Sequence, residues 1–207
     1  MISRIYHKFN VKVNHNNEIP GIQSIAEDID TKEEVLLNKI LDENYELLLR
    51  LQKFSGKLFE RSKYISEVSY QAALKINANG KVTKAGGMYS KIGRTISKDY
   101  IIDGIRLLEE YEFPQNVIDI VKQHSLKFGN PRSKEAAIVM ISDNIIASLD
   151  AMKNMKDSKP IPTNKLIDGI FTLRLSKSNL DESGLSITDL KYLKEFYINE
   201  FNKTNDE

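Results

Sequence analysis

Apolar and small residues recur with a helical period in this sequence, and the clearest case lies between residues 65 and 76. There they occupy positions i, i+3, i+4, i+7, i+8 and i+11, at Ile65, Val68, Ser69, Ala72, Ala73 and Ile76. Such spacing places side chains on one face of an α-helix, whereas one face of a strand needs a period of two. The pattern therefore predicts a helix that buries this face against other helices.

The same period continues along most of the chain and predicts an all-α helical domain over residues 34–202. Ser133 is expected to cap a long helix that runs to about Met152. On that helix one stripe is predicted to contain Ala136, Val139, Met140, Asp143 and Ala147. The adjacent Gly86 and Gly87 lie in a shorter helical stretch, where the missing side chains would allow two backbones to approach closely.

Two other helix starts can be located from local signals. Pro114 fits the first turn of a helix, because its missing N–H would have no partner there. Ser186 and Asp189 are spaced like the two ends of a capping box and predict the start of the last helix. Residues 203–207 are expected to form a frayed tail.

Residues 1–33 differ from the rest of the chain. Phe9, Val11 and Val13 alternate with polar residues, which predicts one short strand in a largely irregular segment. The role of this segment is not indicated by its sequence.

Composition excludes several classes of protein. The 30 basic and 29 acidic residues give a net charge of +1, which does not favour capture of a nucleic acid polymer or an anionic membrane. The absence of cysteine excludes disulfides, thiolate nucleophiles and cysteine-ligated zinc. The longest purely apolar run covers residues 136–141, far short of the roughly 20 residues of a membrane span. A cytoplasmic location is expected.

Two polar residues, His124 and Asp143, occupy positions where the helical period calls for apolar ones. A buried imidazole or carboxylate is costly unless it has a partner, so each is expected to be paired. The pairing could be purely structural, or the two could belong to a metal or catalytic site built between helices. His7 and His15 lie in the irregular first segment and are expected to be solvated.

Several segments, in order, resemble one known family. Residues 134–143 (KEAAIVMISD) are similar to its KEAAIVMLAD helix, and residues 180–190 (LDESGLSITDL) to its LDE…LTLKDL ending. Residues 88–94 fall on its YHDIGK signature, and residues 110–124 on a helix that ends in a His-His pair. Residues 35–202 thus resemble the cytoplasmic HD domain of the seven-transmembrane-receptor HD phosphodiesterases. The resemblance implies an HD-domain helical bundle, and a family that hydrolyses cyclic di-AMP at a metal centre.

The same resemblance implies that the metal site is incomplete here. The family's first ligand histidine falls on Arg61, its His-Asp pair on Ser90 and Lys91, and a further histidine on Tyr100. Of its His-His pair, His124 matches and Ser125 does not, while its late aspartate matches Asp143. The chain would be either a stand-alone relative or the cytosolic part of a longer membrane protein.

One imidazole and one carboxylate are too few for a hydrolytic metal centre, which usually has at least three protein ligands. Arg61 and Lys91 would also repel a cation, by about 4 kcal/mol per unit charge at about 4 Å and an effective dielectric near 20, and by twice that for a dication. We therefore expect Asp143 to pair with Lys91, Arg61 or both, and no cofactor to bind. If a metal binds, it would be Mn, Fe or another divalent ion on His124 and Asp143.

These arguments predict a catalytically inactive HD-domain protein, a pseudo-phosphohydrolase with a regulatory, ligand-sensing or interaction role. The alternative is a metal-dependent HD phosphohydrolase or phosphodiesterase that acts on a cyclic dinucleotide or another phosphate ester and recruits ligands such as His7 or His15. Possible partners are a cyclic dinucleotide, another protein or a second copy of the chain. Arg61, Lys91 and Arg94 could hold a phosphate, or could equally be solvated or salt-bridged helix ends.

Overall fold

The computed structural model describes residues 32–154 and 161–203. Within these ranges the regular elements are helices and no strand occurs, so the predicted all-α class is confirmed. The predicted strand at residues 9–13 and most of the tail after residue 202 lie outside the described residues. The proposed division of the chain between residues 33 and 34 stays a prediction.

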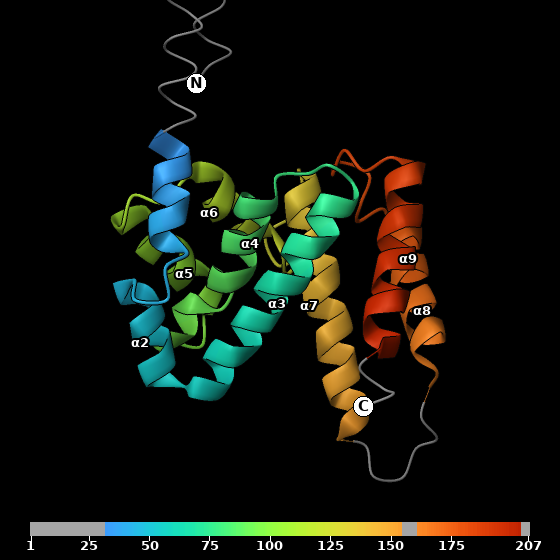
Figure 1. Ribbon diagram of the computed structural model, residues 1–207, viewed down its shortest axis with the longest axis horizontal. Helices are drawn as coiled ribbons and strands as arrows, with labels where there is room; N and C mark the ends of the chain where they lie inside the picture. The colour runs from blue at the N-terminus through green and yellow to red at the C-terminus, as the bar shows by residue number, and fades with distance from the viewer. Residues whose placement is uncertain (1–31, 155–160, 204–207) are drawn as a thin grey trace, which may run out of the picture. The chain divides into compact units, whose positions relative to one another are not determined.

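A helix over residues 32–40 precedes the labelled elements of Figure 1. The chain then continues through α2 (Glu46–Phe54), α3 (Gly56–Lys75), α4 (Gly80–Tyr89), the short 3-10 helix η2 (Ile92–Thr95), α5 (Tyr100–Glu110), α6 (Gln115–Gln123), α7 (Lys134–Lys153), α8 (Thr163–Ser176) and α9 (Ile187–Lys203).

Side chains cap the helices where the sequence predicted caps. Ser133 Oγ accepts a hydrogen bond from the Ala136 N–H at 3.1 Å, at the start of α7. At the start of α9, Ser186 and Asp189 each accept the other's backbone N–H at 3.0 Å, which forms the predicted capping box. Pro114 lies one position earlier than predicted, at the N-cap of α6, because its ψ of 136° is not helical.

The centre of the fold is made by α3, α4 and α7, which pack against one another (Figure 1). The glycine pair of α4 permits this packing. A Cβ at Gly87 would lie 2.8 Å from the Ser66 Cα of α3, and one at Gly86 would lie 2.5 Å from the Ile120 side chain of α6. Both distances are shorter than normal contacts. The predicted close approach of two backbones is therefore confirmed at Gly87, whereas Gly86 makes room for a side chain.

The buried face of α7 differs from the predicted stripe at one position. Ala136, Val139 and Met140 are fully buried, and Asp143 is partly buried. Ala147 is exposed, because the buried face continues through Ile145 and Ile146 instead. A helix packed against neighbours on several sides does not keep the single narrow stripe of a surface helix.

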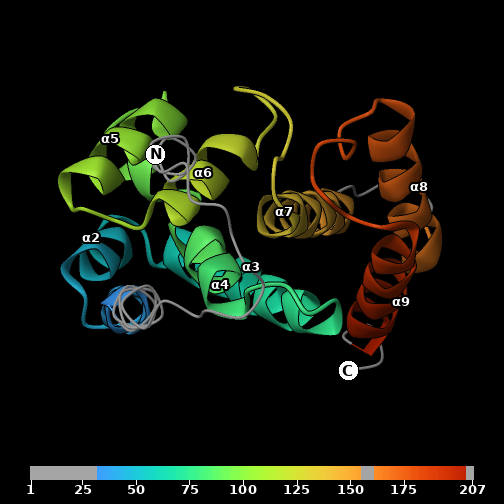
Figure 2. The same cartoon turned by 90° about the horizontal axis from the view of Figure 1, so that it is seen from above.

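The helices α8 and α9 lie together at one end of the described part of the chain, beyond α7 (Figures 1 and 2). A hydrogen bond of 2.9 Å joins Tyr197 of α9 to Ser142 of α7 through their hydroxyl groups. Among the described residues, no helix is both long enough and apolar enough to cross a lipid bilayer.

Candidate functional site

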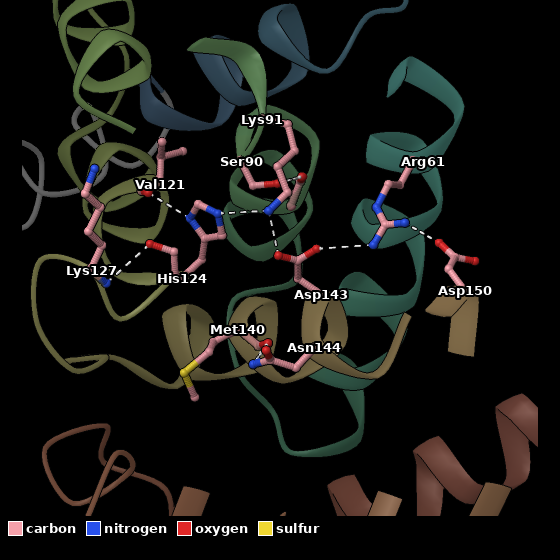
Figure 3. A network of polar contacts seen from close by, with 12 residues as sticks. Arg61, Ser90, Lys91, Val121, His124, Lys127, Met140, Asp143, Asn144 and Asp150 are labelled. Carbon is pink, nitrogen blue, oxygen red and sulfur yellow. Dashed lines mark hydrogen bonds and ion pairs between the residues drawn. The ribbon is translucent and has the colours of Figure 1, made fainter. Parts of the chain in front are cut away.

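Three helices bring polar side chains to one buried point (Figure 3). Lys91 follows Ser90, the C-cap residue of α4, and His124 is the C-cap residue of α6. Asp143 lies in the middle of α7. The close packing of α4 against α6 and α7 holds the three side chains together, although they are far apart in the sequence.

The ammonium group of Lys91 lies between the other two side chains. Its Nζ is 2.6 Å from Asp143 Oδ2 and 3.2 Å from His124 Nε2. Lys91 is 6% exposed and His124 1%, while the Asp143 side chain is 18% exposed. The ion pair that the sequence predicted between Asp143 and Lys91 is therefore present, and it is largely shielded from water.

The partners of His124 assign its protonation state. A lysine ammonium can only donate, so His124 Nε2 accepts from Lys91. The other ring nitrogen, Nδ1, then carries the proton and donates to the Val121 carbonyl at 2.8 Å. Burial and, second to it, the positive charge of Lys91 lower the pKa of His124 to about 4. The ring is thus neutral at pH 7.

Arg61 of α3 extends the ion network outward along α7. Its Nη2 is 3.9 Å from Asp143 Oδ1, and its Nη1 donates to Asp150 Oδ2. The Arg61 side chain is 29% exposed and that of Asp150 is 48% exposed. Two cations and two carboxylates therefore alternate along the network, so each negative charge has a positive neighbour.

The ring of Tyr100, the first residue of α5, lies near Lys91 and Arg94. Lys91 Nζ lies 5.5 Å from the ring centroid, and the guanidinium carbon of Arg94 lies 4.5 Å from it. Both distances are typical of cation–π contacts. Arg94 is exposed and stacked on this ring, so two of the three cations considered for phosphate binding, Lys91 and Arg94, share one aromatic partner.

Two residues named from the resemblance do not direct their side chains to this point. Ser90 Oγ donates to the Gly87 carbonyl at 2.9 Å within its own helix. Ser125 Oγ accepts from the Lys127 N–H at 3.4 Å. The structure thus brings together Arg61, Lys91, Tyr100, His124 and Asp143, and leaves Ser90 and Ser125 beside them.

The residues at this point do not fit a divalent metal ion. Within the described ranges no three His, Cys, Asp or Glu side chains are grouped as a metal site would require. His124 Nε2 and Asp143 Oδ2 each already accept from the same ammonium group. A metal bound to both would have to lie about 2.0–2.2 Å from each atom, in the space next to that positive charge. His7 and His15, the alternative ligands, lie outside the described residues.

Sequence reasoning missed Asp150 as a member of this network. It lies seven residues, or two helical turns, after Asp143 on α7, and so projects from nearly the same face. That spacing is the signal that could have identified it. An expectation of burial could not have identified Asp150, because its side chain is 48% exposed.

Comparison with known proteins agrees with the geometry of the fold. No protein-family model matches the sequence. The chain is 25% identical over 206 residues to the cyclic-di-AMP phosphodiesterase PgpH of Bacillus subtilis, and 22% identical over 214 residues to that of Listeria monocytogenes. These matches cover 74% and 78% of this chain but only 29% of each relative, so the chain corresponds to less than a third of their length.

Solved structures agree with these matches. The HD domain of Listeria monocytogenes PgpH in complex with cyclic di-AMP superposes with a TM-score of 0.69, at 22% identity, over 78% of this chain and 97% of that domain. The same domain in a second structure gives the same TM-score at 23% identity and is covered completely. The described part of the chain therefore has the fold of the PgpH HD domain.

Proposed function

We propose that this chain is a catalytically inactive HD domain, a pseudo-phosphohydrolase that acts as a regulatory or interaction module. The observation that carries the proposal is the position of the Lys91 ammonium group. It lies within hydrogen-bonding distance of both His124 and Asp143, the two residues that match the family's metal ligands. The Lys91 ammonium group, a single positive charge attached to the chain, takes the place of a divalent ion.

The chemistry of such a site differs from that of a metal centre. A bound divalent metal would supply a Lewis acid and an activated water molecule. An ammonium group neutralises Asp143 and fixes the His124 ring, but it has no open coordination position for water. His124 is also held neutral by Lys91 and Val121, which leaves neither ring nitrogen available as an acceptor for a substrate proton.

A ligand-sensing role is a specific form of this proposal. The solved Listeria monocytogenes domain of the same fold holds cyclic di-AMP. Two cations lie near the Lys91 site in this chain, and each already has a partner. Arg61 pairs with two carboxylates, and Arg94 stacks on the Tyr100 ring. Arg61 and Arg94 are both more exposed than Lys91. A phosphate could therefore bind to either of them without breaking the buried Lys91–Asp143 pair.

The competing function is a metal-dependent phosphodiesterase, which the names of the sequence relatives favour. An assay of cyclic di-AMP hydrolysis with added manganese separates the two functions. The full chain is assayed beside the matching domain of the Bacillus subtilis relative as a positive control, and the metal content of each sample is measured. We expect no hydrolysis above the protein-free rate. Turnover together with bound metal would contradict the inactive assignment.

Thermal unfolding with and without cyclic di-AMP then tests the ligand-sensing form. A ligand that binds only the folded chain raises its stability by about 2.7 kcal/mol at 100 times its dissociation constant. An upward shift in melting temperature without hydrolysis supports a sensor. No shift at high nucleotide concentration leaves the interaction role as the form of the proposal that remains.

A further inference from the structure

Helix α2 carries a groove of about 790 Å³, at the end of the described part of the chain opposite to α8 and α9 (Figures 1 and 2). Residues of α2 and Thr95 of η2 line it. The helix buries Leu47, Leu48 and Leu51 in the core, and the groove lies on the part of its surface that the core leaves free. The groove contains none of the residues of the Lys91 site.

Two large apolar side chains line this groove and are open to water. Leu49 is 46% exposed and Phe54 is 55% exposed. With 3.6 residues per turn, Arg50 and Lys53 project from the same face of the helix, between these two side chains. Single exposed apolar residues are normal on a protein surface, but large ones that meet in one groove are typical of an interaction site.

The groove is positively charged, and its cations are unpaired. Arg50 and Lys53 are both exposed, and within the described ranges neither side chain has an ion pair or a hydrogen-bonding partner. The lining contains one carboxylate, Glu46, which lies in the first turn of α2, whereas Lys53 lies in the last turn. Unpaired charge of one sign attracts a partner of the opposite sign and excludes a partner of the same sign.

The shape and the charge of the groove together favour an acidic peptide over an anionic lipid bilayer. When a peptide binds in a groove, its apolar side chains enter the groove and its charged side chains pair at the edges. Binding to the surface of a bilayer instead requires an apolar face that is inserted among the lipid headgroups. Leu49 and Phe54 line a hollow, with cations between them, which suits side chains that enter from a peptide.

We propose that the groove of α2 binds an acidic peptide segment of a partner protein. Aliphatic side chains of the segment pack against Leu49 and Phe54, and its carboxylates pair with Arg50 and Lys53. The inference does not depend on the proposed loss of catalysis, because the two concern different residues.

Fluorescence anisotropy of a labelled synthetic peptide tests the proposal on the full chain. The peptide has the sequence of residues 18–30 (EIPGIQSIAEDID), which contains four carboxylates, four isoleucines and no lysine or arginine. The expected dissociation constant is below about 100 μM at low salt. A second peptide, with glutamine and asparagine in place of the four acidic residues, is expected to bind at least about tenfold more weakly.

Two variants of the groove are compared with matched controls. Lys53→Glu is expected to raise the dissociation constant on the order of tenfold, because it reverses one of two cations. Its control is Lys122→Glu on α6, also an exposed lysine in the last turn of a helix of nine residues. Leu49→Ser is expected to raise the constant about fivefold, with Leu74→Ser of α3, which is 48% exposed, as its control. Both controls lie outside the groove and should stay within about twofold of the wild-type constant.

Two results of the peptide titrations would overturn the proposal. One is the absence of binding by the wild-type chain at about 1 mM. The other is an equal effect of groove and control variants, with circular dichroism establishing that all are folded. Co-sedimentation with phosphatidylcholine vesicles that contain about 30% phosphatidylglycerol examines the lipid alternative. Vesicle binding that Lys53→Glu abolishes, without peptide binding, would assign the groove to a lipid surface and would also overturn the proposal.

Discussion

The ion network has an inner and an outer half that differ in environment although they share one helix. The inner half, Lys91 with His124 and Asp143, is nearly closed to water, whereas the Arg61–Asp150 pair lies at the surface. Charges removed from water depend on their partners, while exposed pairs contribute little because water can replace either partner. The contrast indicates that the inner half holds the fold together and that the outer half can be rearranged at small cost.

The largest expected effect is that of Asp143→Ala. The variant leaves the buried ammonium group of Lys91 with a neutral imidazole as its remaining polar partner. Breaking a buried pair in this way costs about 3–5 kcal/mol in the free energy of unfolding, which urea denaturation measures. A loss below about 1 kcal/mol would mean that the Lys91–Asp143 pair stabilises the fold no more than an exposed ion pair does.

Acid should weaken the inner half through His124. Its pKa is about 4 in the folded chain and 6.5 when unperturbed, so the unfolded chain takes up a proton first. The contribution of His124 is therefore complete above pH 6.5 and is lost as the pH falls toward 4. The slope is up to about 1.4 kcal/mol per pH unit.

Urea titrations across this pH range measure the effect, with His124→Gln as the control. Glutamine can accept from Lys91 and does not titrate. The variant should lose the additional slope between pH 6.5 and 4. The same slope in wild type and variant would assign the acid sensitivity to carboxylates elsewhere in the chain.

Lys91→Met is expected to have a smaller effect than Asp143→Ala. The variant buries an apolar chain of similar length and leaves Asp143, which is more exposed and still has Arg61 nearby. Loss of a hydrogen bond to a charged group costs about 1.5–3 kcal/mol. In the double variant with Asp143→Ala, the two losses should not add, because both remove the same pair. Strict additivity of the unfolding free energies would show that the two side chains are not coupled.

The smallest effect is expected at the outer half. Asp150→Ala should change the free energy of unfolding by less than about 1 kcal/mol, since the carboxylate that is removed is 48% exposed. The comparison with Asp143→Ala on the same helix is direct, because both variants remove a carboxylate that contacts Arg61. Equal losses for the two variants would remove the distinction between the inner and outer halves.

The sequence predicted the parts of this structure that follow from local rules. The helical face from Ile65 to Ile76, the caps at Ser133 and Ser186 and the close approach at Gly87 depend on spacing and on backbone sterics. A buried carboxylate requires a partner, which predicted that Asp143 is paired. Lys91 and Arg61 were named as its possible partners because the family resemblance places both at this site.

Other features depend on tertiary packing, which periodicity does not contain. Ala147 is exposed because the buried face of α7 continues through Ile145 and Ile146. The contacts of Arg61 with Asp150 and of Arg94 with Tyr100 depend on how separate helices meet. Ser90 and Ser125 are placed at the site by the resemblance, yet each hydroxyl bonds to nearby backbone instead.

A crystal structure of the chain grown with excess manganese would test the central claim most directly. Anomalous scattering identifies manganese and distinguishes it from an ammonium nitrogen at the same place. We expect no anomalous peak between His124 and Asp143, and Lys91 Nζ within hydrogen-bonding distance of both. A manganese ion coordinated by His124 Nε2 and an Asp143 carboxylate oxygen, with the Lys91 side chain displaced, would contradict the account.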